Sequence, residues 1–253
     1  MGPDHIIARL RAIRDGRMRV RVLIEALGEG DPTAWIEALA AMIAHSHVGH
    51  DADALLAVQS ITHAAADPAL PYETRKRLYE AAIDRGSPEI ARLFLAASPN
   101  LAVAPQLEKQ LAPERPLVPA GRPLSLGERK ALARTNLREQ ILLLLRDPHP
   151  AIVAILLDNP HVTESDVLRI ATRRPAVPET LAGLAAHPRW SVRHAVKRAL
   201  VQNPSTPLAD AIRIITTLRV AELAELAADP ALAGPLRTHA AEVRAASLRR
   251  PRA

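Results

Sequence analysis

Residues 159–170 read NPHVTESDVLRI and residues 203–214 read NPSTPLADAIRI, inside a longer stretch from Asp147 to Pro230. The Asn-Pro pair, the aspartate and the Arg-Ile pair of these two segments all recur at an offset of 44 residues. A second series places Asp-Pro or His-Pro at 147–148, 187–188 and 229–230, with steps of 40 and 42 residues. Repetition at this spacing is typical of stacked helical repeats, so we predict an all-α fold.

The amino-acid composition favours helices. Apolar residues make up 48% of the 253 residues but aromatic residues only 2%, so the core must consist of Ala, Leu, Ile and Val. The absence of cysteine excludes disulfides, thiolate metal sites and cysteine nucleophiles. The N-terminus does not resemble a signal sequence, and the longest apolar runs, 141–145 and 151–157, are too short to span a membrane. We expect a cytoplasmic protein without a membrane partner.

The net charge of +6 at pH 7 comes almost entirely from arginine, because lysine occurs only at positions 76, 109, 130 and 197. An excess of arginine is typical of proteins that bind an acidic partner such as nucleic acid. A composition rich in Ala, Arg and Pro is equally typical of a GC-rich genome. The charge alone does not separate these two interpretations.

The sequence divides into four regions. Residues 1–102 are predicted to form an N-terminal helical region with degenerate repeats, because Asp67-Pro-Ala-Leu70 matches Asp229-Pro-Ala-Leu232 at an offset of 162. Residues 103–127 contain five prolines and two glycines, which predicts a crossover loop or linker. Residues 128–248 are predicted to form the C-terminal repeats, and residues 249–253 a basic tail.

A histidine cluster at His45, His47 and His50, followed by Asp51 and Asp53, is the stretch that most resembles a metal site. Metal-binding histidines need further ligands from elsewhere in the chain, and the order of residues here does not match a metallo-hydrolase loop. We therefore expect a polar turn between two helices, with Asp51 at the N-cap of the second, and no metal.

Three predicted helices in about 44 residues resemble the armadillo and HEAT repeat families. The segment His187-Pro-Arg-Trp-Ser-Val-Arg-His-Ala-Val196, followed by Asn203-Pro-Ser-Thr-Pro207, also resembles the bacterial leucine-rich repeat variant. The resemblance covers about residues 143–246 well and 51–97 loosely, but not the proline-rich segment. It implies a right-handed α-solenoid that serves as a scaffold, and it implies no catalytic residues.

The candidate binding surface is one face of a predicted helix from Trp190 to Gln202. At 100° per residue, the apolar side chains fall on one side and Trp190, Arg193, His194 and Lys197 on the other. An outward aromatic ring flanked by cations can stack a planar group and pair with an anion. Four further arginines extend this surface: Arg169, Arg173, Arg174 and Arg213. Alternatively, Trp190 packs over the preceding repeat, and Arg193 braces the stack against Asp158 or Asp166.

These features predict a non-catalytic scaffold that mediates protein–protein interaction through an unidentified partner. The sequence contains no phosphate-binding loop, no His-Glu-x-x-His and no Gly-x-Ser-x-Gly motif. We therefore expect no enzyme activity, no cofactor and no small-molecule substrate. The alternative is a nucleic-acid-binding HEAT-like protein with a basic concave face. If this HEAT-like protein were a DNA glycosylase, it would need an acidic residue beside an aromatic one. The candidates for the acidic residue are Asp158, Asp166 and Asp210.

Overall fold

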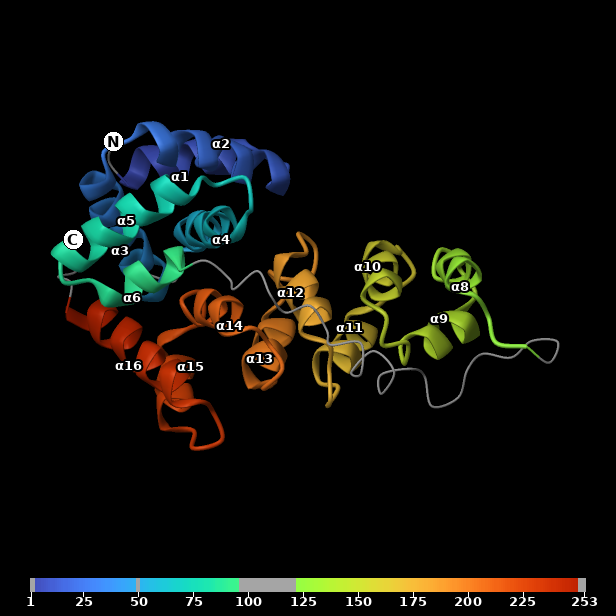
Figure 1. Ribbon diagram of the computed structural model, residues 1–253. Coiled ribbons are helices and arrows are strands. Elements are labelled where there is room, and N and C mark those ends of the chain that lie inside the picture. The colour runs from blue at the N-terminus through green and yellow to red at the C-terminus, as the bar shows by residue number, and fades with distance from the viewer. Residues whose placement is uncertain (1–2, 49–50, 96–121, 250–253) are drawn as a thin grey trace. The chain divides into compact units, whose positions relative to one another are not determined.

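The computed structural model describes residues 3–48, 51–95 and 122–249, and all of its regular elements in these ranges are helices. The predicted all-α class is therefore confirmed. The chain divides into two compact units (Figure 1). Residues 98–207 form the central unit, and residues 1–97 together with 208–253 form the terminal unit. The proline-rich segment lies mostly outside the described residues, as does the basic tail beyond residue 249.

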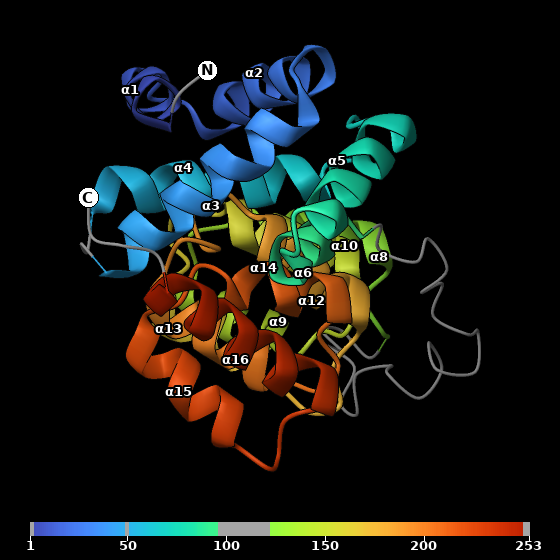
Figure 2. The ribbon, with the colours of Figure 1, turned by 90° about the vertical axis from the view of Figure 1, so that its left-hand side faces the viewer.

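The terminal unit brings the two ends of the chain together. Its described helices are, in chain order, α1 (Pro3–Ala12), α2 (Gly16–Glu29), α3 (Pro32–Val48), α4 (Ala52–Ala66), α5 (Tyr72–Asp84), α6 (Pro88–Ala91), η1 (Arg92–Phe94), α14 (Leu208–Ile215), α15 (Val220–Ala228) and α16 (Gly234–Arg249). Helix α3 lies at the centre, where it contacts α1, α4, α5, α6 and α16. Figure 2 shows α15 and α16 lying side by side. Helices α14 to α16 thus pack with the N-terminal helices, although the sequence placed them with the repeats of 128–248.

In the described part of the central unit, residues 122–207, six short helices lie in two rows (Figure 1). The first row contains α8 (Leu126–Leu132), α10 (Pro150–Asp158) and α12 (Pro178–Ala186), and α10 contacts both of its neighbours. The second row contains α9 (Arg138–Leu144), α11 (Glu164–Ala171) and α13 (His194–Gln202), with α11 packed against α13. Consecutive helices alternate between the rows, so each connecting loop passes from one row to the other.

Six helices are followed by the same turn, which contains an Asp, Asn or His before proline. This residue is the C-cap in five of them and lies two residues beyond the C-cap of α9, Leu145. In each, the backbone N–H of this residue donates to the carbonyl three residues earlier, and its side chain accepts from the N–H two residues later. Proline excludes the helical conformation of the residue before it, and the side chain then stabilises the turn. The six residues are Asp67, Asp147, Asn159, His187, Asn203 and Asp229. These pairs therefore mark the positions where helices have ended.

The 44-residue offset corresponds to a step of three helices. At this offset Asn159, the C-cap of α10, corresponds to Asn203, the C-cap of α13. Helix α11 corresponds in the same way to α14. Because three is an odd number, α10 and α13 lie in different rows of the central unit. The repeat seen in the sequence is therefore a repeat of local helix–turn structure, and its copies occupy alternate rows.

Candidate interaction surface

The predicted binding surface on residues 190–202 depends on an exposed Trp190, and this part of the prediction is wrong. Helix α13 begins at His194, and residues 190–193 form a turn before it. Trp190 is only 2% exposed, and its indole Nε1–H donates to the carbonyl of Leu157 at 2.8 Å. Val192, expected inside, is 42% exposed. The helical angle of 100° per residue does not apply to a turn, so the predicted faces do not hold there. Trp190 instead packs within the unit, which was the alternative.

The cation that stacks on Trp190 also comes from the chain itself. The guanidinium carbon of Arg189 lies 4.2 Å from the centre of the Trp190 ring, and Arg189 donates to the carbonyl of Val162 at 3.4 Å. The aromatic–cation pair expected to receive a ligand is thus part of the packing of the α12–α13 loop against α10 and the α10–α11 loop. A helical period that starts at Trp190 relates the ring to residues after it, so it gives no signal for the contact with Arg189.

Two of the predicted cations are buried. Lys197 is 5% exposed and lies on the inner side of α13. Arg213, also 5% exposed, belongs to α14 in the terminal unit, where it donates to the carbonyls of Leu93 at 3.1 Å and Leu95 at 2.6 Å. Its guanidinium therefore stabilises the C-terminal end of η1. Neither side chain belongs to an exposed surface, so this part of the prediction is wrong.

The other predicted cations lie on the surface of the central unit or at its edge. Arg169, Arg174, Arg193 and His194 are exposed and Arg173 is half-buried. They come from α11, from the α11–α12 loop and from the start of α13. Exposed arginines of the central unit that the prediction did not include are Arg122, Arg134, Arg138, Arg146 and Arg189. The cations are therefore distributed along the loops and do not form one helical stripe.

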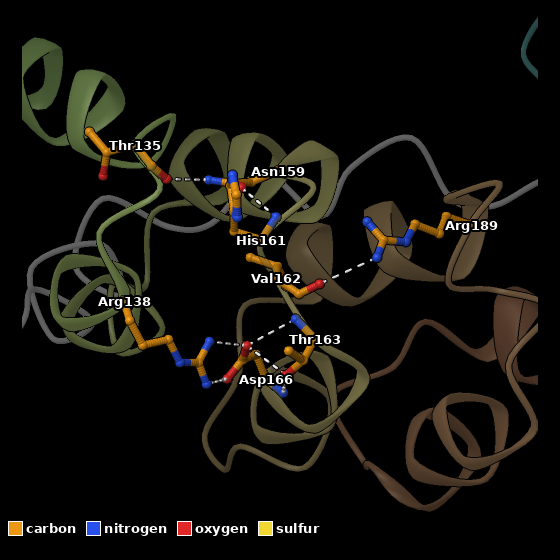
Figure 3. A network of polar contacts seen from close by, with 8 residues as sticks. All are labelled: Thr135, Arg138, Asn159, His161, Val162, Thr163, Asp166 and Arg189. Atoms are coloured by element: carbon orange, nitrogen blue, oxygen red, sulfur yellow. Dashed lines mark hydrogen bonds and ion pairs between the residues drawn. The ribbon is translucent and has the colours of Figure 1, made fainter.

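These loops form two series, and hydrogen bonds link successive loops within each series. The first edge comprises the α8–α9, α10–α11 and α12–α13 loops. Figure 3 shows its polar network. Asn159 donates to the carbonyls of Ala133 at 2.8 Å and Thr135 at 2.9 Å, and Arg189 reaches Val162 as described. Side chains thus satisfy carbonyls that the ends of short helices leave without a partner.

The second edge comprises the α9–α10 and α11–α12 loops and the turn after α13. Arg173 donates to the carbonyl of Arg146 at 2.7 Å, and Arg174 donates to the carbonyl of Gln202 at 2.7 Å. Asn203 donates to the carbonyls of Ala171 at 2.8 Å and Arg173 at 2.9 Å, as Asn159 does on the first edge. Both edges therefore combine a fixed backbone with outward-facing arginine side chains.

A buried carboxylate fixes α9 against α11. Arg138 forms a bidentate pair with Asp166, at 2.6 and 2.7 Å, and Asp166 also accepts from the backbone N–H and hydroxyl of Thr163 (Figure 3). The hydrogen bond from Arg138 is the largest cause that lowers the pKa of Asp166 to about 2. Arg193 was expected to pair with Asp158 or Asp166. The partner of Asp166 is instead Arg138, and Asp158 lies 3.2 Å from His187. Asp210 pairs with Arg213 in the terminal unit.

The net charge of the chain lies entirely in the central unit. Residues 98–207 contain 15 Lys and Arg against 9 Asp and Glu, a net charge of +6. The remaining residues contain 18 of each and are neutral. A composition effect of the genome would act on both units alike. The asymmetry therefore favours a role of the positive charge in the central unit.

The histidine cluster has a different structure from a metal site. His47 is buried, with its ring nitrogens 2.7 Å from Ser247 Oγ and 3.0 Å from the carbonyl of Thr216. Burial lowers the pKa of His47 to about 4. His50 lies outside the described residues, and no group of three potential metal ligands occurs within the described ones. Asp51 is the N-cap of α4, as predicted, and accepts from the N–H groups of Asp53 and Ala54.

Among the described residues, every helix is too short or too polar to cross a lipid bilayer. The chain matches no protein-family model, and no curated protein and no solved structure shows significant similarity to it.

Proposed function

We propose that this chain is a non-catalytic helical-repeat scaffold that binds an acidic partner protein through the central unit. The observation that carries this proposal is the confinement of the net charge of +6 to residues 98–207, next to a neutral terminal unit. Stacked short helices present an extended surface, and such surfaces commonly serve protein recognition. The two-row packing of α8 to α13 supports an α-solenoid arrangement of the kind that armadillo and HEAT repeats adopt.

The two loop edges suit this role because their backbone is held in place. Hydrogen bonds from Asn159, Asn203, Arg173, Arg174 and Arg189 join successive loops of each edge. Binding then requires little additional ordering of the backbone, which lowers the entropic cost of association. Guanidinium groups along such an edge can form bidentate hydrogen bonds with the carboxylates of a partner.

Affinity capture of the full chain from its native cytoplasm tests the proposal. Arg146, Arg169 and Arg193 are exposed in the central unit, so we expect the triple variant Arg146→Glu, Arg169→Glu, Arg193→Glu to lose the partner. The matched control is Arg14→Glu, Arg17→Glu, Arg21→Glu, which changes the net charge equally on exposed positions of the terminal unit. Loss of the partner from both variants, or from neither, would contradict a specific role of the central unit.

Nucleic-acid binding is the second candidate, and the same charge distribution favours it. Residues 98–207 contain a single aromatic residue, Trp190, which is buried. Stacking of bases on exposed aromatic rings, on which single-strand binding depends, therefore has no Trp, Tyr or Phe available in this unit. Binding through phosphates remains the form to test. A salt titration against duplex DNA distinguishes the candidates, because phosphate contacts predict affinity that falls steeply with salt. Absence of DNA binding at low salt would remove this candidate.

A further inference from the structure

Both tyrosines of the chain lie on one exposed face of helix α5, in the terminal unit. Tyr72 is 69% exposed, Tyr79 37% and Ile83 47%. The remaining aromatic residues are the buried Trp35, Trp190 and Phe94. Tyrosine is enriched in the cores of protein interfaces, since it buries a large area at low entropic cost. The exposed aromatic surface of the described residues is thus confined to this helix.

The spacing of the exposed residues is that of a helix–helix seam. Tyr72, Lys76, Tyr79 and Ile83 follow each other at steps of four, three and four residues, which places them within about 60° of one another around the helix. The opposite face packs into the unit through Thr74, Leu78 and Ala82. Alternating steps of three and four are the pattern by which one helix packs along another. The exposed face of α5 therefore has the pattern of a surface that receives a partner helix.

The seam is complementary to itself when a second copy runs antiparallel. A two-fold axis between residues 77 and 78 places Tyr72 opposite Ile83 of the second copy, and Lys76 opposite Tyr79. Lys76 then lies over an aromatic ring and near Glu80 of the second copy, which gives a cation–π contact and an ion pair. In the single chain Lys76 and Glu80 lie 4.0 Å apart on this same exposed surface. A parallel arrangement would instead oppose Lys76 to Lys76 and Glu80 to Glu80.

We propose that the exposed face of α5 is a homodimer interface, in which two copies of this chain pair antiparallel about that axis. The pairing is isologous, so it closes at two copies. A helix of 13 residues is about 20 Å long, so the interface belongs to the small class, below about 1,200 Å². We therefore expect a dissociation constant of about 10–100 µM. This inference goes beyond the proposed function and does not depend on it, because the central unit is not involved.

Sedimentation velocity of the full chain between about 1 and 300 µM tests the dimer. Wild type should shift from the monomer mass towards twice that mass over this range. Ile83→Lys should raise the dissociation constant about tenfold or more, whereas Met18→Lys, at a site on α2 that is 51% exposed, should change it less than about twofold. A chain that stays monomeric throughout, or a dimer that Ile83→Lys leaves intact, overturns the proposal.

The register is tested by crosslinking, for which the absence of cysteine in the chain is an advantage. Mixed with each other, Tyr72→Cys and Ile83→Cys proteins should form a disulfide between copies, because the antiparallel register places these positions together. Either protein alone should not, since its two cysteines would lie at opposite ends of the seam. Crosslinking of each protein with itself, without crosslinking of the mixture, overturns the antiparallel arrangement. Circular dichroism spectra like that of wild type establish that each variant is folded.

Discussion

The identity of each residue before proline follows from the hydrogen bonds that it makes. Asp67 and Asp229 only accept, from the N–H two residues later, and an aspartate oxygen suffices for that. Asn159 and Asn203 accept in the same way, but each also donates from its amide to two carbonyls of an earlier loop. Only the amide provides both functions. The Asn-Pro pairs of the sequence are therefore the positions where a helix end is joined to an earlier loop.

The substitutions Asn203→Asp and Asp229→Asn should have unequal effects on the free energy of unfolding. Asn203→Asp replaces the donating amide with a carboxylate that faces two carbonyl oxygens at a position only 3% exposed, so we expect a loss of about 2–3 kcal/mol in the free energy of unfolding. Asp229→Asn keeps its single accepting oxygen at a partly exposed position and should change that free energy by less than about 0.5 kcal/mol.

Urea denaturation, followed by circular dichroism at neutral pH, measures both free energies of unfolding. Because Asn203 and Asp229 end equivalent helix turns, the second variant is a control for the first. Equal losses in the two variants would show that the cap alone matters and that the hydrogen bonds of Asn203 to Ala171 and Arg173 contribute nothing.

Trp190 illustrates what sequence reasoning at the residue scale misses. Its position among charged residues suggested an outward aromatic ring, but the ring is held inside by its bond to Leu157 and covered by Arg189. The cause is a helix that begins four residues later than predicted, at His194. Exposure depends on such boundaries, whereas the helix ends at Asn-Pro and Asp-Pro depend on local chemistry. The ends were therefore predictable, and the exposed face was not.

A buried polar network joins three elements of the terminal unit: α3, the turn after α14, and α16. Thr216 is its centre. Its carbonyl lies 3.0 Å from Nε2 of His47, and its hydroxyl lies 3.0 Å from Nε2 of His239. A carbonyl only accepts, so Nε2 of His47 donates to Thr216. Nδ1 of His47 lies 2.7 Å from the hydroxyl of Ser247, which also lies 2.8 Å from the carbonyl of Val243 and has one proton for these two acceptors. His239 donates to Thr216, which in turn donates to the carbonyl of Ile212.

Acid should destabilise the terminal unit through these histidines. Burial is the main cause that lowers the pKa of both His47 and His239 to about 4, and the nearby Arg92 lowers that of His239 further. In the unfolded chain they titrate near 6.5, so between pH 6.5 and 4 the unfolded state binds more protons. We therefore expect the free energy of unfolding to fall as the pH decreases from 6.5 to 4, by up to about 3 kcal/mol for each histidine.

Chemical denaturation at several pH values measures this slope. His47→Gln should be less stable than wild type at pH 7, because it loses part of the network, but its stability should fall less steeply below pH 6.5. Replacement of the exposed His5 or His161 provides the control. A wild-type stability that is flat from pH 6.5 to 4 would show that the two buried histidines do not control acid unfolding.

At the scale of the whole molecule, the sequence predicted the helical class but not the grouping of the helices. The repeats of 128–248 have matching local structure, yet α14 to α16 pack with the N-terminal helices. Equivalent positions show the difference: Arg169 is exposed on α11, whereas Arg213, its repeat equivalent, is buried against Leu93 and Leu95. A sequence period records local structure and carries no information about which distant segment covers a given face.

The division of the chain into two units also shows where the net charge lies. Counted over the whole chain, +6 is a small excess, but in the central unit it is the difference between 15 cationic and 9 anionic residues. The terminal unit is neutral and carries the exposed face of α5. Recognition of an acidic partner and pairing of two copies would thus take place on different units. Substitutions in the central unit should therefore abolish partner binding without affecting dimerisation, and substitutions on α5 should do the reverse.

The most direct test of the central claim is the dissociation constant of the captured partner, measured for three proteins at one salt concentration. These are wild type, the triple variant at Arg146, Arg169 and Arg193, and the matched triple variant in the terminal unit. We predict that the central-unit variant weakens binding about tenfold or more, at least about 1.4 kcal/mol, and that the terminal-unit variant stays within about twofold of wild type. Equal dissociation constants for the two variants would contradict the claim that the central unit binds the partner.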